Sequence, residues 1–250
     1  MAGLSPRRAM FPAKPPPGPA SEPPQVETRR LRLRALRLTD SARVRRLAGD
    51  RAIATNTLLI PHPYEEGMAE KWILAQPERY RKGREVTFAI VPRAGRLLVG
   101  VIGLRLTKKH SRGELGYWIG KPYWNRGYAT EAAEAVLRYG FQTLGLHRIC
   151  AFHFGRNPAS GRVLQKLGMT YEGTERQHIL KWGTFEDLAG YGILRAEFEA
   201  REGRYTGARV SSGSGTEAAD SVSTFRSSAR REKLKKAASN MAASTANSKP

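Results

Sequence analysis

The segment Gly116-Tyr-Trp-Ile-Gly-Lys-Pro-Tyr-Trp-Asn-Arg-Gly-Tyr-Ala-Thr130 decides the fold prediction, because it joins an extended run to a helix through a glycine-containing turn. Pro122 interrupts the extended run, and a helical pattern continues from Tyr128 to Leu144. The N–H groups in the first turn of a helix are unpaired, and the helix dipole adds partial positive charge there. Gly127 and Ala129 would let the backbone approach a ligand, so this turn predicts a cradle for a diphosphate group.

Outward from this segment, the apolar pattern predicts one α/β domain. The expected strands alternate or form short apolar runs, and they cover residues 29–36, 86–91, 97–106, 113–120, 147–154, 177–181 and 188–194. The expected helices carry apolar residues at helical spacing and cover residues 39–49, 65–81, 128–144 and 158–167. Thr39 and Asp40 are expected to cap the first of them. Short turns between the strands from 86 to 120 predict an antiparallel meander.

The two ends of the 250-residue chain differ in composition from its middle. Proline crowds the first stretch, and Ser, Ala, Thr, Gly and Lys fill the last. We therefore expect a disordered leader over residues 1–28, one folded domain over residues 29–199 and a disordered basic tail over residues 200–250. The formal net charge of +21 fits polyanionic partners and predicts weak nucleic-acid contact through a basic surface.

The single cysteine and the hydropathy of the chain indicate in which cellular compartment the protein is expected. The one cysteine, Cys150, cannot form an internal disulfide, and no apolar stretch is long enough for a membrane helix. We expect a cytoplasmic, soluble protein that is a monomer or a homodimer and does not bind membranes. An organellar location is the alternative, because Arg7, Arg8 and Lys14 precede the first acidic residue, as in a transit peptide.

Several motifs occur in a specific order. A leading Glu27-Thr-Arg-Arg-Leu-Arg-Leu-Arg34, the turn at 125–130 and the pair Asn157-Pro-Ala-Ser160 before a helix resemble the GNAT superfamily, specifically its ribosomal-protein-alanine N-acetyltransferase branch. The resemblance covers residues 27–195 and implies an α+β fold. Its sheet would be mixed, mostly antiparallel, flanked by helices, and splayed open between the strand ending at Gly120 and the one starting at His147.

The resemblance also implies acetyl-coenzyme A as the acetyl donor and no metal. Residues expected to bind this cofactor are Ile119, Asn125, Arg126, Gly127, Tyr128, Ala129, Thr130, Asn157 and Ser160. The backbone N–H of Ile119 would hold the developing oxyanion, and Ser160 would protonate the leaving thiolate. Asn157 would hold the pantetheine arm, although its spacing also fits an ordinary helix N-cap. Trp124 stands where the superfamily loop has Gln or Arg.

The acceptor side of the predicted site is less well marked. Glu114 begins the strand that lines the splay and is expected to act as general base, directly or through water, with a solvated strand end as the alternative. His178 is a second candidate base. Tyr117, His178 and Trp182 are expected to contact the acceptor, although strand aromatics more often pack in a core. Cys150 is expected to be a core residue and not a nucleophile.

The implied reaction is acetyl transfer to a primary amine by direct attack in a ternary complex, with the α-amine of a ribosomal protein N-terminus as the first candidate. An α-amine, whose pKa is about 7.7–8.0, is partly neutral at neutral pH, whereas a lysine side chain, whose pKa is about 10.4, needs a stronger base. One alternative is a small-molecule acetyltransferase for an antibiotic, polyamine or amino acid, with an acidic pocket from Glu65, Glu66 and Glu70. The other is a nucleic-acid or ribosome-binding protein that uses the fold as a scaffold and binds through its basic tail.

Overall fold

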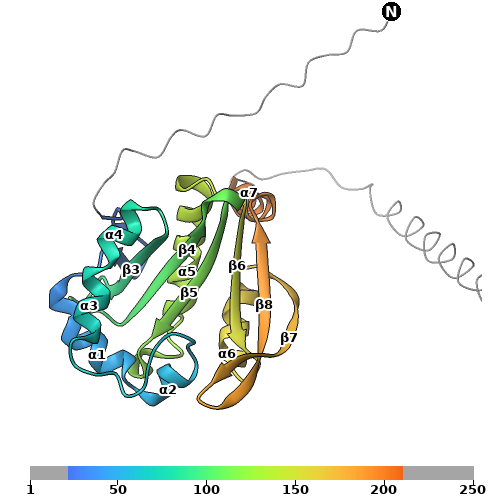
Figure 1. Ribbon diagram of the computed structural model, residues 1–250. Helices are drawn as coiled ribbons and strands as arrows, with labels where there is room; N and C mark the ends of the chain where they lie inside the picture. The colour runs from blue at the N-terminus through green and yellow to red at the C-terminus, as the bar shows by residue number, and fades with distance from the viewer. Residues whose placement is uncertain (1–21, 211–250) are drawn as a thin grey trace, which may run out of the picture. The chain divides into compact units, whose positions relative to one another are not determined.

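The computed structural model describes residues 22–210, with side chains as far as residue 202. In this part of the chain, one eight-stranded sheet has the order β1-β2-β3-β4-β5-β6-β8-β7 (Figure 1). Its strands are β1 (Val26–Glu27), β2 (Leu31–Arg34), β3 (Glu85–Pro92), β4 (Gly100–Thr107), β5 (Arg112–Ile119), β6 (Arg148–Phe154), β7 (Thr170–Lys181) and β8 (Thr184–Leu194). The helices are α1 (Ser41–Ala48), α2 (Arg51–Thr55), α3 (Met68–Leu74), α4 (Gln76–Arg81), α5 (Tyr128–Arg138), α6 (Pro158–Lys166) and α7 (Arg195–Val210). Short helical turns are η1 (Leu38–Asp40), η2 (Lys108–His110), η3 (Lys121–Tyr123) and the π-type η4 (Tyr139–Thr143).

The sheet opens between β5 and β6, which are its parallel neighbours. These two strands pair only where Arg112–Leu115 lies against Arg148–Ala151. Beyond that point β5 continues to Ile119 and β6 to Phe154, and the two strands diverge (Figure 1). The other strand pairs are antiparallel, including the meander β3-β4-β5. The mixed, splayed sheet of an α+β fold is therefore confirmed, and one backbone edge of the second half of β5 faces the gap.

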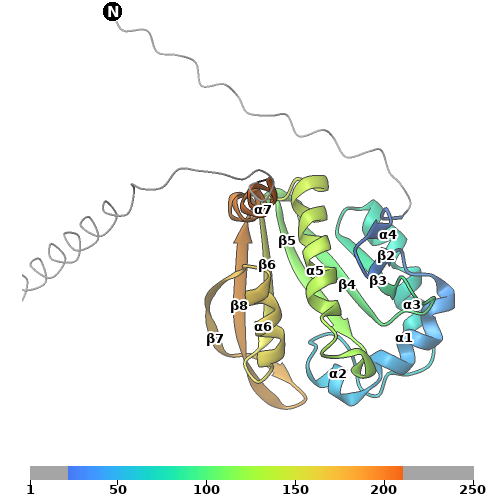
Figure 2. The ribbon, with the colours of Figure 1, turned by 180° about the vertical axis from the view of Figure 1, so that it is seen from behind.

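Two apolar cores fix β5 in place. The larger core lies between the sheet and helices α5 and α6 (Figure 2), and it contains the fully buried Phe88 and Leu104. The smaller core lies beneath α1 and α3 and includes Val101. Side chains alternate along a strand, so Leu104 and Val101 of β4 serve opposite faces. Because both faces next to β5 are packed, this strand is a rigid wall of the splay.

The N-terminal helices differ from the expected ones. The single helix expected over residues 65–81 is two helices, α3 and α4, because Pro77 lies in the first turn of α4 and cannot continue a preceding helix. The short helix α2 was not expected. Asp40 does not cap α1 through its side chain; its carboxylate instead accepts hydrogen bonds from Arg34, at 2.7 and 2.9 Å. Burial would raise the pKa of Asp40, but these bonds and the N–H of Arg37 outweigh it and hold the pKa below its usual value.

Described elements extend past both expected domain limits, residues 29 and 199. Strand β1 pairs with β2 through Val26 and Glu27, so the fold begins before residue 29. At the other end a compact unit extends to Arg204, beyond residue 199. Strand β7 begins at Thr170, earlier than expected, because two irregularities in its pairing with β8 break the alternation that would mark it. Disorder was expected over residues 1–28 and 200–250, but β1 and the end of α7 fall within these ranges; residues 1–21 and 211–250 lie outside the described part of the chain.

Candidate active site

The turn before α5 has the geometry of an anion cradle. Asn125 and Gly127 both adopt left-handed backbone conformations, with φ of 59° and 74°, and Gly127 is the N-cap of α5. The first helical hydrogen bond runs from the N–H of Glu131 to the carbonyl of Gly127, at 3.1 Å. The N–H groups of the preceding turn, from Tyr128 to Thr130, therefore have no acceptor within the helix. A Cβ at Gly127 would meet only Nη2 of Arg30, 3.3 Å away, so the cradle is open. These features fit the diphosphate of coenzyme A.

Side chains around the cradle hold its shape. Trp124, at the position where the superfamily loop has Gln or Arg, donates from Nε1 to the carbonyl of Ile119 at 2.5 Å. Its indole therefore ties the loop to the end of β5. The exposed Arg126 stacks over the Tyr123 ring, 5.7 Å from the centroid. It leaves a fixed cation at the rim, as an anion site needs.

Arg30, at the end of the β1–β2 turn, is a cradle residue that the sequence patterns did not reveal. Its Nη1 donates to the carbonyl of Arg126 at 3.0 Å, and its Nε donates to Glu131 at 2.6 Å. Its guanidinium also lies over the ring of Tyr128, 5.2 Å from the centroid. The signal available in the sequence was weak, because an acidic residue in the first turn of a helix is common. Only the fold shows that Glu131 of α5 holds an arginine from the β1–β2 turn.

A contact between Tyr117 and Ser160 joins β5 to α6 across the splay. The Tyr117 hydroxyl, on β5, lies 2.8 Å from Oγ of Ser160, in the first turn of α6. Burial raises the pKa of Tyr117 to about 12, so the phenol keeps its proton near neutral pH. Asn157 accepts the N–H of Ser160 at 3.3 Å, and it is therefore an N-cap whatever else it does. Tyr117, predicted to contact the acceptor, thus lies on the α5–α6 side of the sheet, beside the predicted acid.

The backbone of β5 also fits its predicted part. The N–H of Gly120 donates to the carbonyl of Val99, the residue just before β4, at 2.9 Å. Backbone groups alternate sides along a strand, so those of Tyr117 and Ile119 point away from β4 and into the gap. The bond from Trp124 to the carbonyl of Ile119 agrees with this direction. The N–H of Ile119 therefore faces the space where the predicted oxyanion would form.

The remaining predicted residues lie farther from this point. Glu114 is in the half of β5 that still pairs with β6, and its carboxylate lies 3.6 Å from Arg105. It is five residues from Ile119, about 17 Å along an extended strand at roughly 3.4 Å per residue. His178 is half exposed and bonds Glu175 at 2.7 Å. Trp182 is exposed in the turn between β7 and β8, with its ring 6.1 Å from that of His62.

Cys150 is a core residue, as expected. It is 3% exposed, and its thiol lies 3.6 Å from the carbonyl of Gly113. Burial raises the pKa of this thiol, so the thiolate that nucleophilic attack requires is disfavoured.

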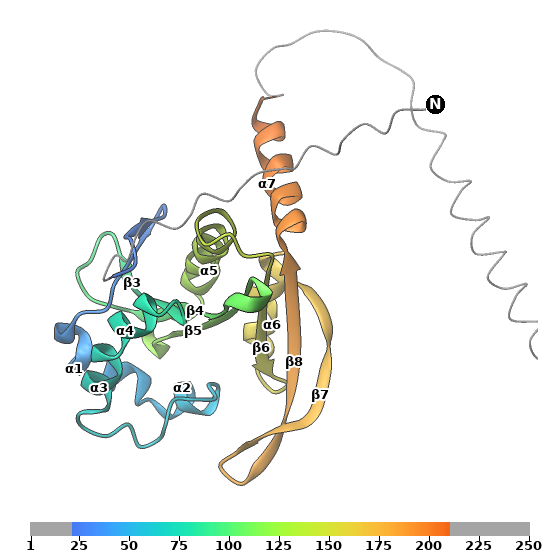
Figure 3. The same ribbon diagram turned by 45° about the horizontal axis from the view of Figure 1, so that its top comes forward.

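The acceptor side of the splay is framed by two segments distant in sequence. The tip of the β7–β8 hairpin meets the loop after α2, where Lys181 donates to the carbonyls of Leu58 and Ile60 at 3.2 and 3.3 Å. Burial of Lys181, together with the nearby charge of Arg156, lowers its pKa. Figure 3 shows this hairpin and the N-terminal helices on opposite sides of the opening. Lys181 thus has a structural part that the sequence patterns did not indicate.

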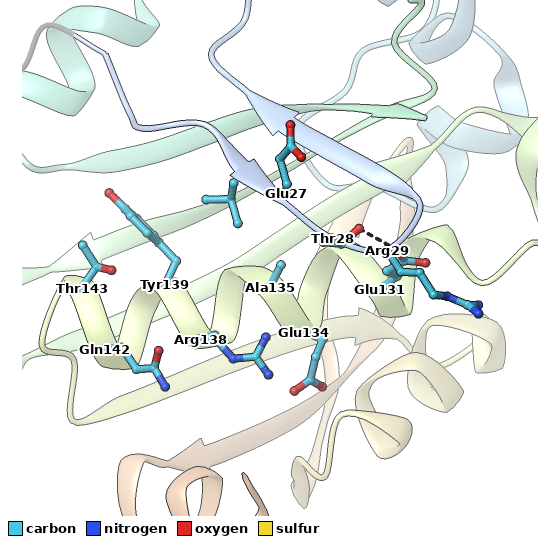
Figure 4. Close-up of a pocket in the computed structure, with 11 residues that line it drawn as sticks. Glu27, Thr28, Arg29, Glu131, Glu134, Ala135, Arg138, Tyr139, Gln142 and Thr143 are labelled. Atoms are coloured by element: carbon cyan, nitrogen blue, oxygen red, sulfur yellow. Dashed lines mark hydrogen bonds between the residues drawn. The ribbon is translucent and has the colours of Figure 1, made fainter. Parts of the chain in front are cut away.

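A separate cavity of about 430 Å³ lies along α5, beside the β1–β2 turn (Figure 4). Its lining includes Thr28, Glu131, Glu134 and Arg138, but neither Tyr117 nor Ser160. The polar groups of this lining are largely satisfied: Glu131 accepts from Thr28 at 2.6 Å, and Glu134 from Arg201 at 2.5 Å. This cavity is therefore distinct from the splay.

The sequence of the folded part of the chain matches one known family. A family model described as "Acetyltransferase (GNAT) domain" matches residues 30–170. The chain belongs to the GNAT acetyltransferases. As a member of this family it is an acetyl-transferring enzyme, and acetyl-coenzyme A is the donor that GNAT acetyltransferases use.

Similar proteins agree with this assignment. "Uncharacterized N-acetyltransferase YoaA" of Bacillus subtilis is 40% identical over 117 residues, which are 46% of this chain and 66% of that protein. The [ribosomal protein uS5]-alanine N-acetyltransferase of Escherichia coli is 37% identical over 73 residues, 29% of this chain and 38% of that protein. A crystal structure of a GNAT acetyltransferase from Bacillus anthracis superposes with a TM-score of 0.62 and 26% identity, covering 69% of this chain and 99% of that one.

The described residues contain neither a membrane-spanning helix nor a metal-binding group of side chains. Between residues 22 and 210, no helix has the length and apolar character needed to cross a bilayer, and no three or more His, Cys, Asp or Glu side chains are grouped to hold a metal ion. Exposed cations without an ion pair gather near the β4–β5 turn, namely Arg84, Lys108, Lys109 and Arg112. Nucleic-acid contact through such a surface stays a prediction, and the basic tail lies outside the described residues.

Proposed function

We propose that this GNAT enzyme acetylates the α-amine of a protein N-terminus, with a ribosomal protein as the first candidate. The observation that carries the proposal is that the carboxylates of β5 and β8, the two strands that border the acceptor side, already have partners within the protein. Within the described part of β5 and β8, Glu114 lies near Arg105, Glu186 bonds Arg156 at 2.7 Å, and Asp187 accepts the N–H of Gln177 at 2.8 Å. Each is engaged, so a strong dedicated base is not supported there. An α-amine needs less help to lose its proton than a lysine does.

Similarity supports the same class of acceptor. The Escherichia coli relative is named for a ribosomal protein alanine, and its match to this chain is 37% identical over 73 residues. The match covers 38% of that relative, so its acceptor enters here only as a proposal. The loop over residues 56–64 and the β7–β8 hairpin, joined through Lys181, border the acceptor side of the splay, where the end of a polypeptide would bind in this proposal.

Three groups of the chain would carry the reaction. When bound, the thioester of acetyl-coenzyme A supplies an activated acetyl group. The N–H of Ile119 donates a hydrogen bond to the carbonyl oxygen as negative charge develops on it. Ser160 would give its proton to the departing sulfur and would take the proton of the Tyr117 phenol, which lies 2.8 Å away and is a stronger acid than an aliphatic hydroxyl. Solvent then restores the tyrosine proton.

The amine must also lose a proton. Glu114 can receive it only through water, since the residue lies about 17 Å along the strand from Ile119. We therefore propose that Glu114 has an indirect part and that water at the open mouth of the splay is the immediate acceptor. The positioning of the amine and the thioester between β5 and α6 would then contribute most of the rate enhancement.

Two of the three carboxylates in the acidic pocket of the small-molecule alternative have partners on α1. Glu66 lies 3.6 Å from Arg45 on α1, and a hydrogen bond from Ser41 lowers the pKa of Glu70. The side chain of Glu66 is nevertheless 92% exposed and Glu65 is exposed as well, so these carboxylates can still attract a polycation, and the peptide panel is therefore tested beside polyamines.

The test is thiol release from acetyl-coenzyme A with a panel of peptide N-termini, polyamines and aminoglycosides. We expect turnover with peptides that begin with small residues, and none with peptides whose α-amine is blocked. In Ser160→Ala, kcat should fall about 100-fold through loss of a positioned acid, while the affinity for coenzyme A changes less than about threefold. Tyr117→Phe should give a smaller loss of kcat. Turnover confined to polyamines would replace this proposal with the small-molecule one.

A further inference from the structure

Arg30 has one nitrogen without a protein partner, and this nitrogen lies at the cofactor cradle. Its Nε and Nη1 are bound by Glu131 and by the carbonyl of Arg126. Within the described residues Nη2 has no hydrogen-bond partner, and it lies 3.3 Å from the position that a Cβ of Gly127 would take. The side chain is 41% exposed, so this nitrogen can reach a ligand.

Glu131 fixes the direction of this guanidinium. Besides the Nε of Arg30, its carboxylate accepts the Thr28 hydroxyl at 2.6 Å and the backbone N–H of Arg30 at 2.8 Å. Figure 4 shows the Thr28–Glu131 bond between the β1–β2 turn and α5. Partial burial would raise the pKa of Glu131, but these hydrogen bonds outweigh it and hold the pKa below its usual value. The carboxylate is therefore charged near neutral pH and keeps the arginine in one orientation.

An isolated carboxylate at this place would work against anion binding. Glu131 lies in the first turn of α5, next to the N–H groups that form the cradle. Its charge is balanced by Arg30, whose free nitrogen then faces the side where a phosphate would lie. A planar guanidinium suits this double task, because it can bind a carboxylate through one edge and a phosphate through another.

We propose that Arg30, oriented by Glu131 and Thr28, is a diphosphate-binding residue of the coenzyme A site and also holds the cradle loop in its binding conformation. The proposal rests on the assignment of the cradle to coenzyme A. It adds to the loop and α5 a cation from the β1–β2 turn, 101 residues away from Glu131 in sequence. The N-terminal segment of the domain thereby becomes part of the cofactor site.

The experiment compares wild type with Arg30→Ala by calorimetric titration with coenzyme A, in the full-length chain. We expect a 10- to 100-fold weaker Kd, the usual consequence of losing a charged hydrogen bond, and a weaker dependence of Kd on salt. The same variant should lose 10- to 100-fold in kcat/KM with acetyl-coenzyme A but change little with S-acetylpantetheine, which lacks the diphosphate. Arg30→Lys should have a Kd between those of the wild type and Arg30→Ala, because a lysine keeps the positive charge but lacks the forked guanidinium group.

Arg93→Ala is the matched control. Arg93 also holds the β1–β2 turn, through the carbonyl of Thr28 at 3.3 Å and Glu27 at 3.6 Å, but it does not touch the cradle loop. Its loss should leave the Kd for coenzyme A unchanged. Equal weakening by Arg93→Ala and Arg30→Ala would overturn the proposal in favour of simple loosening of the turn.

The remaining outcomes are also decisive. If Arg30→Ala binds coenzyme A like wild type, or loses equally with S-acetylpantetheine, Arg30 is not a diphosphate ligand. If Arg30→Ala does not fold, Glu131→Gln and Arg30→Lys serve instead, and wild-type Kd in both would overturn the proposal. No binding of coenzyme A by the wild-type protein would instead refute the assignment of the cradle, and with it the part of Arg30.

Discussion

Replacing Gly127 with glutamate should abolish useful binding of coenzyme A. A residue with a side chain at this position must adopt a left-handed backbone, at φ of 74°, which costs about 1–2 kcal/mol of folding stability. The new carboxylate would lie near the phosphates. Two like charges about 5 Å apart, at an effective dielectric constant of about 20–40, repel each other by about 2–3 kcal/mol.

The structure adds a second penalty in this variant. Nη2 of Arg30 lies 3.3 Å from the Cβ position of residue 127, so the glutamate would also pair with Arg30 and neutralise it. The combined loss is about 3–5 kcal/mol of binding free energy, or at least about 100-fold in Kd, because about 1.4 kcal/mol corresponds to a factor of ten.

The assay is calorimetric titration of the Gly127→Glu protein with coenzyme A, after thermal unfolding has shown that the protein is folded. Gly127→Asn is the control, since asparagine tolerates the left-handed backbone and adds no charge. It should weaken binding less than about tenfold. A Gly127→Glu protein that binds within threefold of wild type would show that the diphosphate does not lie at this turn.

Two further predictions concern stability and loop geometry. Asp40→Asn should lower the free energy of unfolding by about 2–4 kcal/mol at pH 7, because it leaves the nearly buried Arg34 without its charged partner. Because the pKa of Asp40 is lowered in the folded state, its contribution to the free energy of unfolding is present above about pH 4 and is lost as the pH falls through the folded-state pKa. The free energy of unfolding, measured with urea, should therefore change less between pH 7 and pH 3 in Asp40→Asn than in the wild type. Trp124→Phe removes the bond to the carbonyl of Ile119 and should weaken coenzyme A binding about two- to tenfold at nearly unchanged thermal stability; unchanged affinity would mean that the indole does not shape the loop.

Much of the fold could be predicted because its signals are local. The strands β3, β4, β5 and β6 follow apolar runs or alternation, and their expected limits agree with the structure to within about three residues. The errors have local physical causes. Pro77 divided one expected helix into α3 and α4, and pairing irregularities hid most of β7.

Some features of the candidate site could likewise be predicted from local sequence, and others could not. The cradle could be predicted, because a left-handed glycine followed directly by a helix is a property of consecutive residues. The N-cap at Asn157 could be predicted for the same reason. The environment of Glu114 could not, since its partner Arg105 lies on the neighbouring strand β4 and only strand pairing brings the two together.

By itself, the sequence determined the helix start at Tyr128, the course of β5 and the family. Tertiary structure alone decided that Tyr117 meets Ser160, 43 residues away, and that Arg30 meets Glu131, 101 residues away. The physical reason is that periodicity and turn chemistry act over a few neighbouring residues, whereas these contacts depend on which strands and helices pack together. Packing at the splay and beside α5 therefore brings together the groups to which the reaction and the cofactor contact are assigned.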